Sequence, residues 1–237
     1  MTIFVERPPA TSTFPLDRRA SWAAAALFVL GGAFQLAEFL LERSPDAPGA
    51  RVDWWLAHDG RTQLSQAVGL LAVPLMIGGF LYGYRLIREQ SRRLSLVAIS
   101  LLVIAMVGLG MVHGIEFAAR WAAVAGHRAA ATDILQASNP GLPGIVGFVM
   151  FLGCAVLGNV LVAVALWRSR YVPRVVAVLV IAFAVLDFAA GQGLAAHVLD
   201  LGTDGLFAWA FLSGYVRGES TPSTSETGPT GSPAVAH

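Results

Sequence analysis

Five long apolar segments limit what this chain of 237 residues can fold into. A helix needs about 20 apolar residues to cross the roughly 30 Å hydrocarbon layer of a bilayer. Five stretches reach that length: Ala20 to Leu41, Leu64 to Tyr84, Leu96 to Phe117, Gly144 to Leu166 and Val175 to Ala196. A sixth, Leu206 to Val216, is too short unless it begins near Leu199 and carries Asp200 and Asp204 in its first turns. The pattern predicts an all-α, polytopic transmembrane helical bundle of about six helices, five of full length and one short.

Composition supports a membrane protein and excludes several other classes. The chain is 56% hydrophobic and 13% charged, whereas soluble domains are about 45–50% apolar and about 25% charged. All 16 basic residues are arginines, and without lysine no Schiff base to retinal or pyridoxal phosphate can form. The single cysteine, Cys154, excludes an internal disulfide and a multi-cysteine metal site. A net charge of +1, with arginines spread over short loops, argues against a nucleic-acid partner.

The arginines also predict how the bundle is oriented. Short cytoplasmic loops retain positive charge, and with the N-terminus inside and six crossings the inner segments hold eleven arginines and the outer ones five. We therefore expect a multi-pass protein of the cell membrane with its N-terminus in the cytoplasm. If the sixth segment is only re-entrant, the C-terminus moves outside.

Three regions are expected along the chain. Residues 1–18 are polar and rich in proline and are predicted to form a short cytoplasmic leader. Residues 19–217 form the transmembrane bundle. Residues 218–237 are rich in Ser, Thr, Pro and Gly and have no apolar face to bury, so we expect a disordered tail.

Asp187 is the ionisable residue that lies deepest in an apolar segment. It occurs near the middle of the fifth segment, in AFAVLDFAAGQG, where a charged side chain costs about 2.5–3.5 kcal/mol or more. Desolvation favours the neutral carboxylic acid there, and such a group can act as a general acid or carry a proton. The alternative is a structural hydrogen bond to a backbone carbonyl or a serine of a neighbouring helix. Gln192, between Gly191 and Gly193, leaves space beside Asp187 for a ligand and is a candidate substrate-binding residue.

Two polar stripes share one helical spacing. Positions i, i+3 and i+7 lie on one face of a helix, and this spacing joins two sets of residues: Gln35, Glu38 and Glu42 in the first segment, and His113, Glu116 and Arg120 in the third. In the expected topology both stripes run through the outer half of the membrane, with Glu38 and His113 each about 10 Å above the midplane. Glu116 and Arg120 are expected to form a structural i,i+4 ion pair.

We expect Glu38 and His113 to pair with each other and, with Asp187, to line an acidic, histidine-containing pocket that opens to the outer face. These three are the candidate catalytic residues. Gln35 and Glu116 are candidate substrate-binding residues on the same stripes. The alternative is a plain interhelical hydrogen bond of the kind that polar groups make in any membrane bundle.

Two histidines raise the question of a metal or haem. His113 in HGIE and His197 in HVLD each precede a carboxylate by three residues, a spacing at which imidazole and carboxylate can share zinc or iron. A haem held between the two histidines is a related alternative. No His-x-x-x-His pattern is present, and His197 is expected closer to the surface than His113. No cofactor is therefore expected, no metal ligand is assigned, and His197 is counted among the substrate-binding candidates.

The stretch LMIGGFLYGYRLIREQSRRLSLVAISLLVIA, residues 75–105, joins two apolar helices by an arginine-marked turn. In this it resembles small multi-pass bacterial membrane proteins of unassigned function, the DUF4386-like group. The resemblance implies residence in a bacterial inner membrane and no particular activity. In size and in its buried acids the chain is also similar to integral-membrane terpene cyclases, which are small helical bundles that protonate an isoprenoid with buried carboxylates.

Three function classes follow from these features. The first is a membrane-embedded acid–base enzyme that acts on a lipophilic, isoprenoid or lipid-like small molecule. The second is a proton-coupled transporter or channel, and the third is an accessory subunit that contacts another membrane protein or a second copy of the chain. The chain has no phosphate loop, G-x-S-x-G elbow or dinucleotide fingerprint, which argues against ATP-driven and nicotinamide-dependent chemistry.

Overall fold

The computed structural model describes residues 16–88, 91–136, 141–169, 172–188 and 193–219 of the chain. Over these ranges the protein has eight helices and no strands, which confirms the all-α class. Nearly all of the predicted leader, up to residue 15, and the predicted tail from residue 220 lie outside the described residues.

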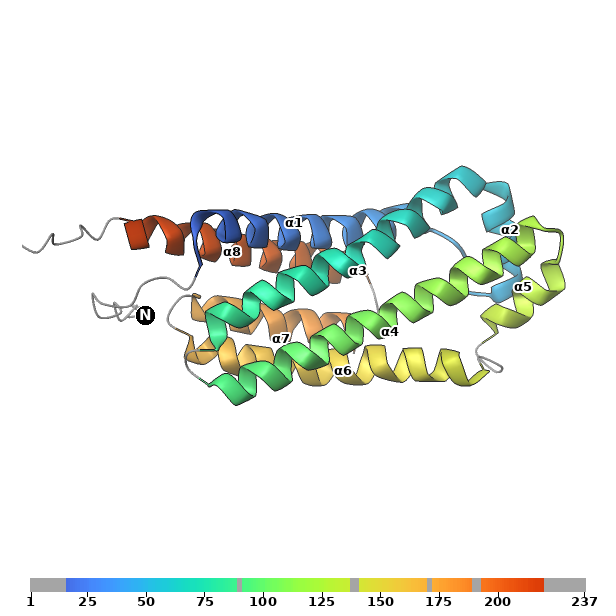
Figure 1. Ribbon diagram of the computed structural model, residues 1–237. Coiled ribbons are helices and arrows are strands. Elements are labelled where there is room, and N and C mark those ends of the chain that lie inside the picture. The colour runs from blue at the N-terminus through green and yellow to red at the C-terminus, as the bar shows by residue number, and fades with distance from the viewer. Residues whose placement is uncertain (1–15, 89–90, 137–140, 170–171, 189–192, 220–237) are drawn as a thin grey trace, which may run out of the picture.

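Four helices are long and apolar enough to cross a membrane. They are α1 (Arg18–Leu41), α3 (Asp59–Ile87), α4 (Arg92–Val124) and α6 (Gly141–Arg168). Figure 1 shows them lying side by side along the length of the bundle. They correspond to the first four predicted segments, whereas the predicted total of about six crossings is not confirmed.

The predicted fifth segment is not one continuous helix. Helix α7 (Arg174–Phe188) ends after 15 residues, and α8 (Leu194–Glu219) then begins well before the predicted sixth segment. At 1.5 Å per residue, α7 is about 22 Å long, which is less than the roughly 30 Å of a hydrocarbon layer. The sequence between the two helices contains Gly191, and glycine has low helix propensity. Figure 1 shows α7 ending about halfway along the bundle and α8 returning toward the end where α1 begins.

Two short helices cover the opposite end of the bundle: α2 (Pro48–Ala57) and α5 (Arg128–Leu135). Val52 of α2 packs with Ala123 and Ala131 in a small apolar cluster. Arg128 donates two hydrogen bonds of 2.7 Å to the carboxylate of Asp53, and this contact holds the pKa of Asp53 below its usual value. Helices α2 and α5 are therefore joined by both apolar and charged contacts.

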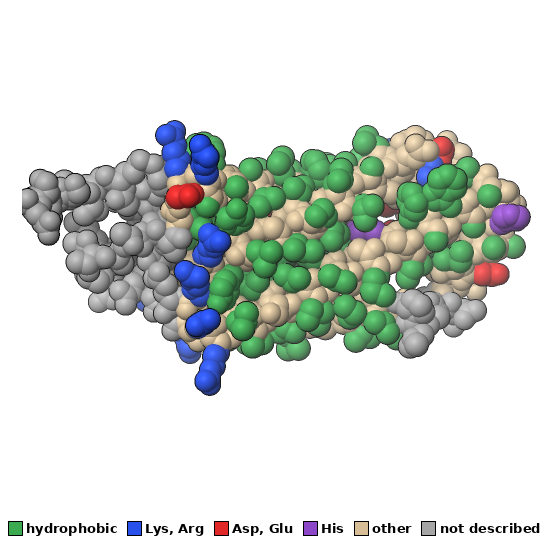
Figure 2. All heavy atoms as spheres, viewed as in Figure 1, with side chains coloured by type: hydrophobic (Ala, Val, Ile, Leu, Met, Phe, Trp, Pro, Cys, Tyr) green, Lys and Arg blue, Asp and Glu red, His purple; other side chains and the backbone are tan. Residues whose placement is uncertain are grey.

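The two ends of the bundle differ in charge. Figure 2 shows a band of arginine side chains near the end where α1 begins and α8 ends, followed by a surface covered with hydrophobic side chains. The exposed arginines toward that end are Arg18, Arg19, Arg85, Arg88, Arg92, Arg93, Arg168 and Arg174. At the α2–α5 end, by contrast, Arg51, Arg120 and Arg128 each lie within ion-pair distance of a carboxylate.

Helices α4 and α6 approach each other closely through glycines. A Cβ atom at Gly108 of α4 would lie 2.5 Å from the backbone nitrogen of Phe151 and 2.7 Å from the carbonyl oxygen of Gly147, both in α6. Farther along, a Cβ at Gly158 would meet the side chain of Leu102 at 2.7 Å. Small residues at such crossings bring two backbones into van der Waals contact, which is a main source of helix association in a bilayer.

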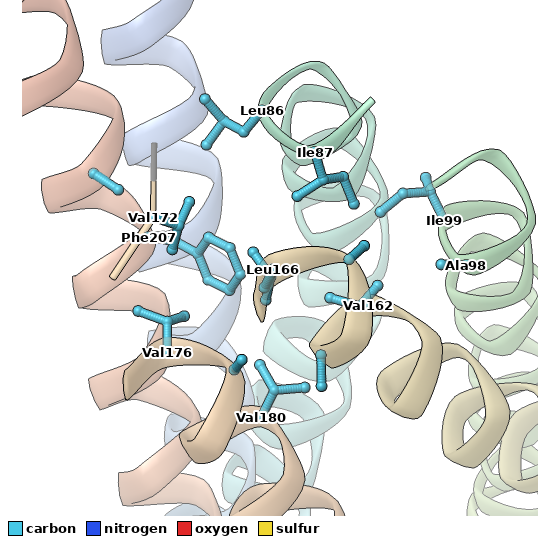
Figure 3. Packing of buried hydrophobic residues seen from close by; sticks show 14 of the residues in the cluster. Leu86, Ile87, Ala98, Ile99, Val162, Leu166, Val172, Val176, Val180 and Phe207 are labelled. Carbon is cyan, nitrogen blue, oxygen red and sulfur yellow. The ribbon is translucent and has the colours of Figure 1, made fainter. Parts of the chain in front are cut away.

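The apolar core is concentrated in the half of the bundle where α1 begins and α8 ends. Figure 3 shows side chains of α3, α6 and α8, among them Ile87, Leu166 and Phe207, gathered in one cluster. Phe28 of α1 stacks on Phe207, with ring centroids 4.9 Å apart, and on Phe211 at 5.9 Å. We call the buried residues Leu86, Ile87 and Leu166 the apolar plug, because they fill the interior next to the arginine band.

Candidate functional site

One large cavity of about 610 Å³ occupies the interior of the bundle. Its lining extends from Ile87 and Leu166 of the apolar plug to Asp46, an exposed residue just before α2. Phenylalanines from α1, α3, α6, α7 and α8 form much of its wall: Phe28, Phe39, Phe80, Phe148, Phe151, Phe183, Phe188 and Phe207. The cavity is therefore wide enough for a small organic molecule, and its wall combines these aromatic rings with aliphatic side chains and a few polar groups, as is usual for ligand sites.

The structure brings Glu38 and His113 together on this cavity. His113 Nδ1 lies 3.4 Å from Glu38 Oε1 and 3.9 Å from Glu116 Oε2. The His113 side chain is only 10% exposed, and its Nε2 atom is buried with no hydrogen-bond partner among the described residues. Gln35 lines the same cavity one turn away on α1. We call Glu38 and His113 the acid–histidine pair.

A glycine on the facing helix makes room for this pair. A Cβ atom at Gly69 of α3 would collide with the carboxyl group of Glu38. On the same side, Ser65 donates a hydrogen bond of 3.3 Å to the backbone carbonyl of Glu38. Helix α3 thus contributes to the site mainly by leaving space for the Glu38 carboxyl group and by contacting its backbone.

The mouth of the cavity carries charged residues, and here one prediction is wrong. Glu116 and Arg120 do not pair with each other: Glu116 accepts from Arg51 of α2 at 3.4 Å, and Arg120 pairs with Asp59 at the start of α3. The i,i+4 spacing allows the predicted pair, but the two side chains contact different neighbouring helices, each of which offers an opposite charge. Glu116 therefore links α4 to α2 at the mouth of the cavity instead of pairing with Arg120.

Glu42 also lies at the polar mouth of the cavity. Its carboxylate accepts hydrogen bonds from the indole nitrogen of Trp55, at 3.4 Å, and from the hydroxyl of Ser44. Arg61 donates to the carbonyl oxygens of Leu40 and Leu41 at the end of α1, at 2.9 and 2.8 Å. These contacts hold the C-terminal end of α1 in place where the cavity opens.

Three aspartates form a second acidic group on the cavity, which we call the aspartate cluster: Asp187 of α7, and Asp200 and Asp204 of α8. All three are buried. Asp200 interacts electrostatically with Asp187, and Asp204 with Asp200. Oδ2 of Asp204 has no hydrogen-bond partner among the described residues, and a Cβ atom at Gly32 of α1 would collide with it.

His197 lies beside the aspartate cluster. It interacts electrostatically with Asp187, its ring stacks on Phe39 with centroids 4.4 Å apart, and its Nδ1 lies 3.1 Å from the carbonyl oxygen of Gly193. Thus Asp187, the acid–histidine pair, Gln35, Glu116 and His197 all line one cavity. Gln192 lies outside the described residues. In the described part of the chain, no group of three His, Cys, Asp or Glu side chains is placed to hold a metal ion.

The sequence predicts no site role for Asp200 and Asp204. They enter the prediction only as charged residues in the first turns of the short sixth segment. The signal was present, because His197, Asp200 and Asp204 repeat the i, i+3, i+7 spacing of the two stripes that were identified. The prediction ends the fifth segment at Ala196 and places His197 just past it, whereas in the structure α8 begins at Leu194 and carries His197, Asp200 and Asp204 on one helix.

No protein-family model, curated protein or solved structure matches this chain.

Proposed function

We propose that this protein is a multi-pass membrane protein whose cavity is the active site of an acid–base enzyme acting on a lipophilic, isoprenoid or lipid-like substrate. The observation that carries the proposal is that one cavity combines aromatic walls, an acid–histidine pair and three buried aspartates. The apolar wall suits a hydrocarbon substrate, and the carboxyl groups suit proton transfer to and from it.

The proposed topology places four complete crossings and a hairpin within the bilayer. Helices α1, α3, α4 and α6 span it, and α7 and α8 form a hairpin that turns back inside it. The arginine band is the cytoplasmic side, so both the N-terminus and the C-terminal end of α8 are cytoplasmic. The cavity then opens to the outer face through its mouth near Asp46.

The proposed reaction is a redox-neutral cyclisation or isomerisation, similar to that of membrane terpene cyclases. A carboxylic acid, Asp187 or Glu38, donates its proton to a carbon–carbon double bond or an epoxide of the substrate. The electron pair of a second double bond forms the new carbon–carbon bond, and a carboxylate or His113 then removes a proton from the resulting cation. Atoms and electrons balance without a cofactor. In this scheme Gln35, Glu116 and His197 contact the substrate.

The aspartate cluster would supply the proton to the closed end of the cavity. Asp187 interacts electrostatically with both His197 and Asp200. A proton lost by Asp187 could therefore be replaced from Asp200 or from Asp204 beyond it. This assigns Asp200 and Asp204 the role of proton carriers and leaves Asp187 as the donor.

The test is turnover of defined linear isoprenoids by the purified protein, with the products identified by mass spectrometry. We expect a product with the same molecular formula as its substrate, and a rate at least about 100-fold lower for Asp187→Asn. Circular dichroism would verify that the variant is folded. The proposal fails if no isoprenoid is converted, or if folded Asp187→Asn turns over at the wild-type rate.

Gly69→Ala tests whether the position of Glu38 matters. The added methyl group would displace the Glu38 carboxyl group from His113, and misplacement of a catalytic group by about 1 Å can lower a rate by up to about 100-fold. We expect at least about a ten-fold loss of turnover with little change in thermal unfolding, because the displaced atoms are the end of a flexible side chain. Gly60→Ala, on the same helix with no atom within 4 Å, is the matched control; equal turnover in the two variants would contradict the prediction.

A proton-coupled transporter is the second candidate. It is favoured by the acidic residues that follow the cavity from Glu42 at the mouth to Asp204. It is disfavoured by the apolar plug, which fills the interior on the arginine side, where a transport path would have to continue. Proteoliposomes showing proton or substrate flux that Asp187→Asn abolishes would reverse this order.

A further inference from the structure

A second, smaller pocket lies between α3 and α4 and shares no lining residue with the large cavity. It has a volume of about 410 Å³ and is lined by residues of α3 and α4 near the α2–α5 end: Gln63, Gln66, Leu70, Phe117, Arg120 and Trp121. We call it the α3–α4 crevice. The acid–histidine pair and the aspartate cluster do not line it, so the proposed reaction gives it no role.

Polar atoms without partners line this crevice. Both the Nε2 and Oε1 atoms of Gln66 and the Nε atom of Arg120 are buried and have no hydrogen-bond partner among the described residues. Arg120 is only 5% exposed, and Asp59 pairs with a different nitrogen of its guanidinium, Nη2. Buried polar groups are nearly always hydrogen-bonded in native proteins. Two residues of the crevice lining thus carry buried donors without partners, Arg120 and Gln66, and Gln66 also carries an acceptor without one.

Apolar side chains lie next to these polar atoms and face outward. Leu70, Phe117 and Trp121 are each about half exposed, at 52%, 46% and 59%. Gln66 follows Asp59, the first residue of α3, by seven residues, which is about 10 Å along the helix. In the proposed topology this is the depth at which the headgroups of the outer leaflet meet its acyl chains.

We propose that the α3–α4 crevice binds a phospholipid of the outer leaflet through its headgroup. The phosphate oxygens accept hydrogen bonds from Arg120 Nε and Gln66 Nε2, and a headgroup hydroxyl donates to Gln66 Oε1. The acyl chains lie against Leu70, Phe117 and Trp121. This pattern selects a headgroup that carries both a phosphate and a hydroxyl, such as phosphatidylglycerol, over phosphatidylcholine, which has no donor.

The experiment is native mass spectrometry of the full-length protein, released from micelles containing equal amounts of phosphatidylglycerol and phosphatidylcholine. We expect the wild type to retain phosphatidylglycerol preferentially, and Gln66→Leu to lose most of that preference, a change of about two- to ten-fold. Both lipids carry a phosphate, so the difference between them rests on the neutral hydrogen bond from the headgroup hydroxyl to Gln66 Oε1, which is worth about that factor. Gln136→Leu, at an exposed position after α5, is the control and should behave as wild type.

Thermal unfolding separates this proposal from a purely structural role of Gln66. Without added lipid, Gln66→Leu should unfold at the wild-type temperature or above it, because it removes two unpaired buried atoms. Added phosphatidylglycerol should raise the unfolding temperature of the wild type more than that of the variant. If Gln66→Leu does not fold, Gln66→Glu keeps the shape of the side chain and should reject the phosphate by charge repulsion.

Three results would overturn the proposal. Equal retention of both lipids by the wild type would show that the crevice does not select a headgroup. Stabilisation by inorganic phosphate alone, lost in Gln66→Leu, would make it a free-anion site. A wild-type dimer that Gln66→Leu converts to a monomer would make it a contact between two copies of the chain.

Discussion

Replacing Gly108 by alanine is expected to lower the free energy of unfolding by about 3 kcal/mol or more, at the upper end of the usual cost of overpacking. The added Cβ atom would lie 2.5 Å from the backbone nitrogen of Phe151 and 2.7 Å from the carbonyl oxygen of Gly147. Both atoms belong to the backbone of α6, so the contact cannot be relieved by rotating a side chain. Either α4 or α6 must move, and both helices line the cavity. Unfolding in detergent, followed by tryptophan fluorescence, would measure the loss.

Gly153→Ala is the matched control for this prediction. Gly153 lies in the middle of α6 and has no atom within 4 Å of its added Cβ atom. Alanine is a better helix former than glycine by about 1 kcal/mol, so this variant should be as stable as the wild type or slightly more stable. Equal destabilisation by the two substitutions would mean that α4 and α6 do not approach closely at Gly108.

Replacing Glu38 by glutamine is expected to reduce turnover of the isoprenoid substrate by about 100-fold or more, because general acid–base catalysis typically contributes about 10²–10⁴-fold. Glutamine has nearly the same shape and can still contact His113, but it can neither donate nor accept a proton at neutral pH. The substitution therefore removes proton transfer and leaves the packing against Gly69 in place. The measurement is the initial rate of product formation, with thermal unfolding as a check on the fold.

Two further variants make the Glu38→Gln result specific. Asp133→Asn changes an exposed carboxylate on α5 and should leave turnover unchanged. His113→Gln should reduce turnover as well, since His113 Nδ1 is the atom that lies 3.4 Å from Glu38 Oε1. If Glu38→Gln retains the wild-type rate while Asp187→Asn does not, the acid–histidine pair is a structural contact and only the aspartate cluster acts on the substrate.

Much of the fold followed from hydropathy alone. The segments that became α1, α3, α4 and α6 were predicted from runs of about 20 apolar residues, because a helix that hides its backbone polar groups needs that length to cross a bilayer. The proximity of Glu38 to His113 was also predicted, since both lie at similar depth on facing stripes and each needs a polar partner. Their roles, like that of Asp187, are still predictions.

The interruption between α7 and α8 could not be read from hydropathy. The run from Val175 to Ala196 is apolar throughout apart from Asp187 and Gln192, and its total length matches a spanning helix. The mean hydropathy of a stretch of about 20 residues does not show where a helix ends within it. Glycine does not mark the end either, because it is common inside membrane helices. Because α7 ends at Phe188 and α8 begins at Leu194, Asp200 and Asp204 lie on α8 and line the same cavity as Asp187.

The partners of the charged residues were likewise decided by the tertiary structure. Spacing along α4 predicted that Arg120 would pair with Glu116, but Arg120 contacts Asp59 of α3 and Glu116 contacts Arg51 of α2. The sequence by itself determined which segments are apolar helices and which faces of them are polar, because those properties are local. Which polar faces meet, and that they enclose a cavity, depends on how closely the helices pack. That distance is set by contacts such as Gly108 against Gly147, between residues far apart in the chain.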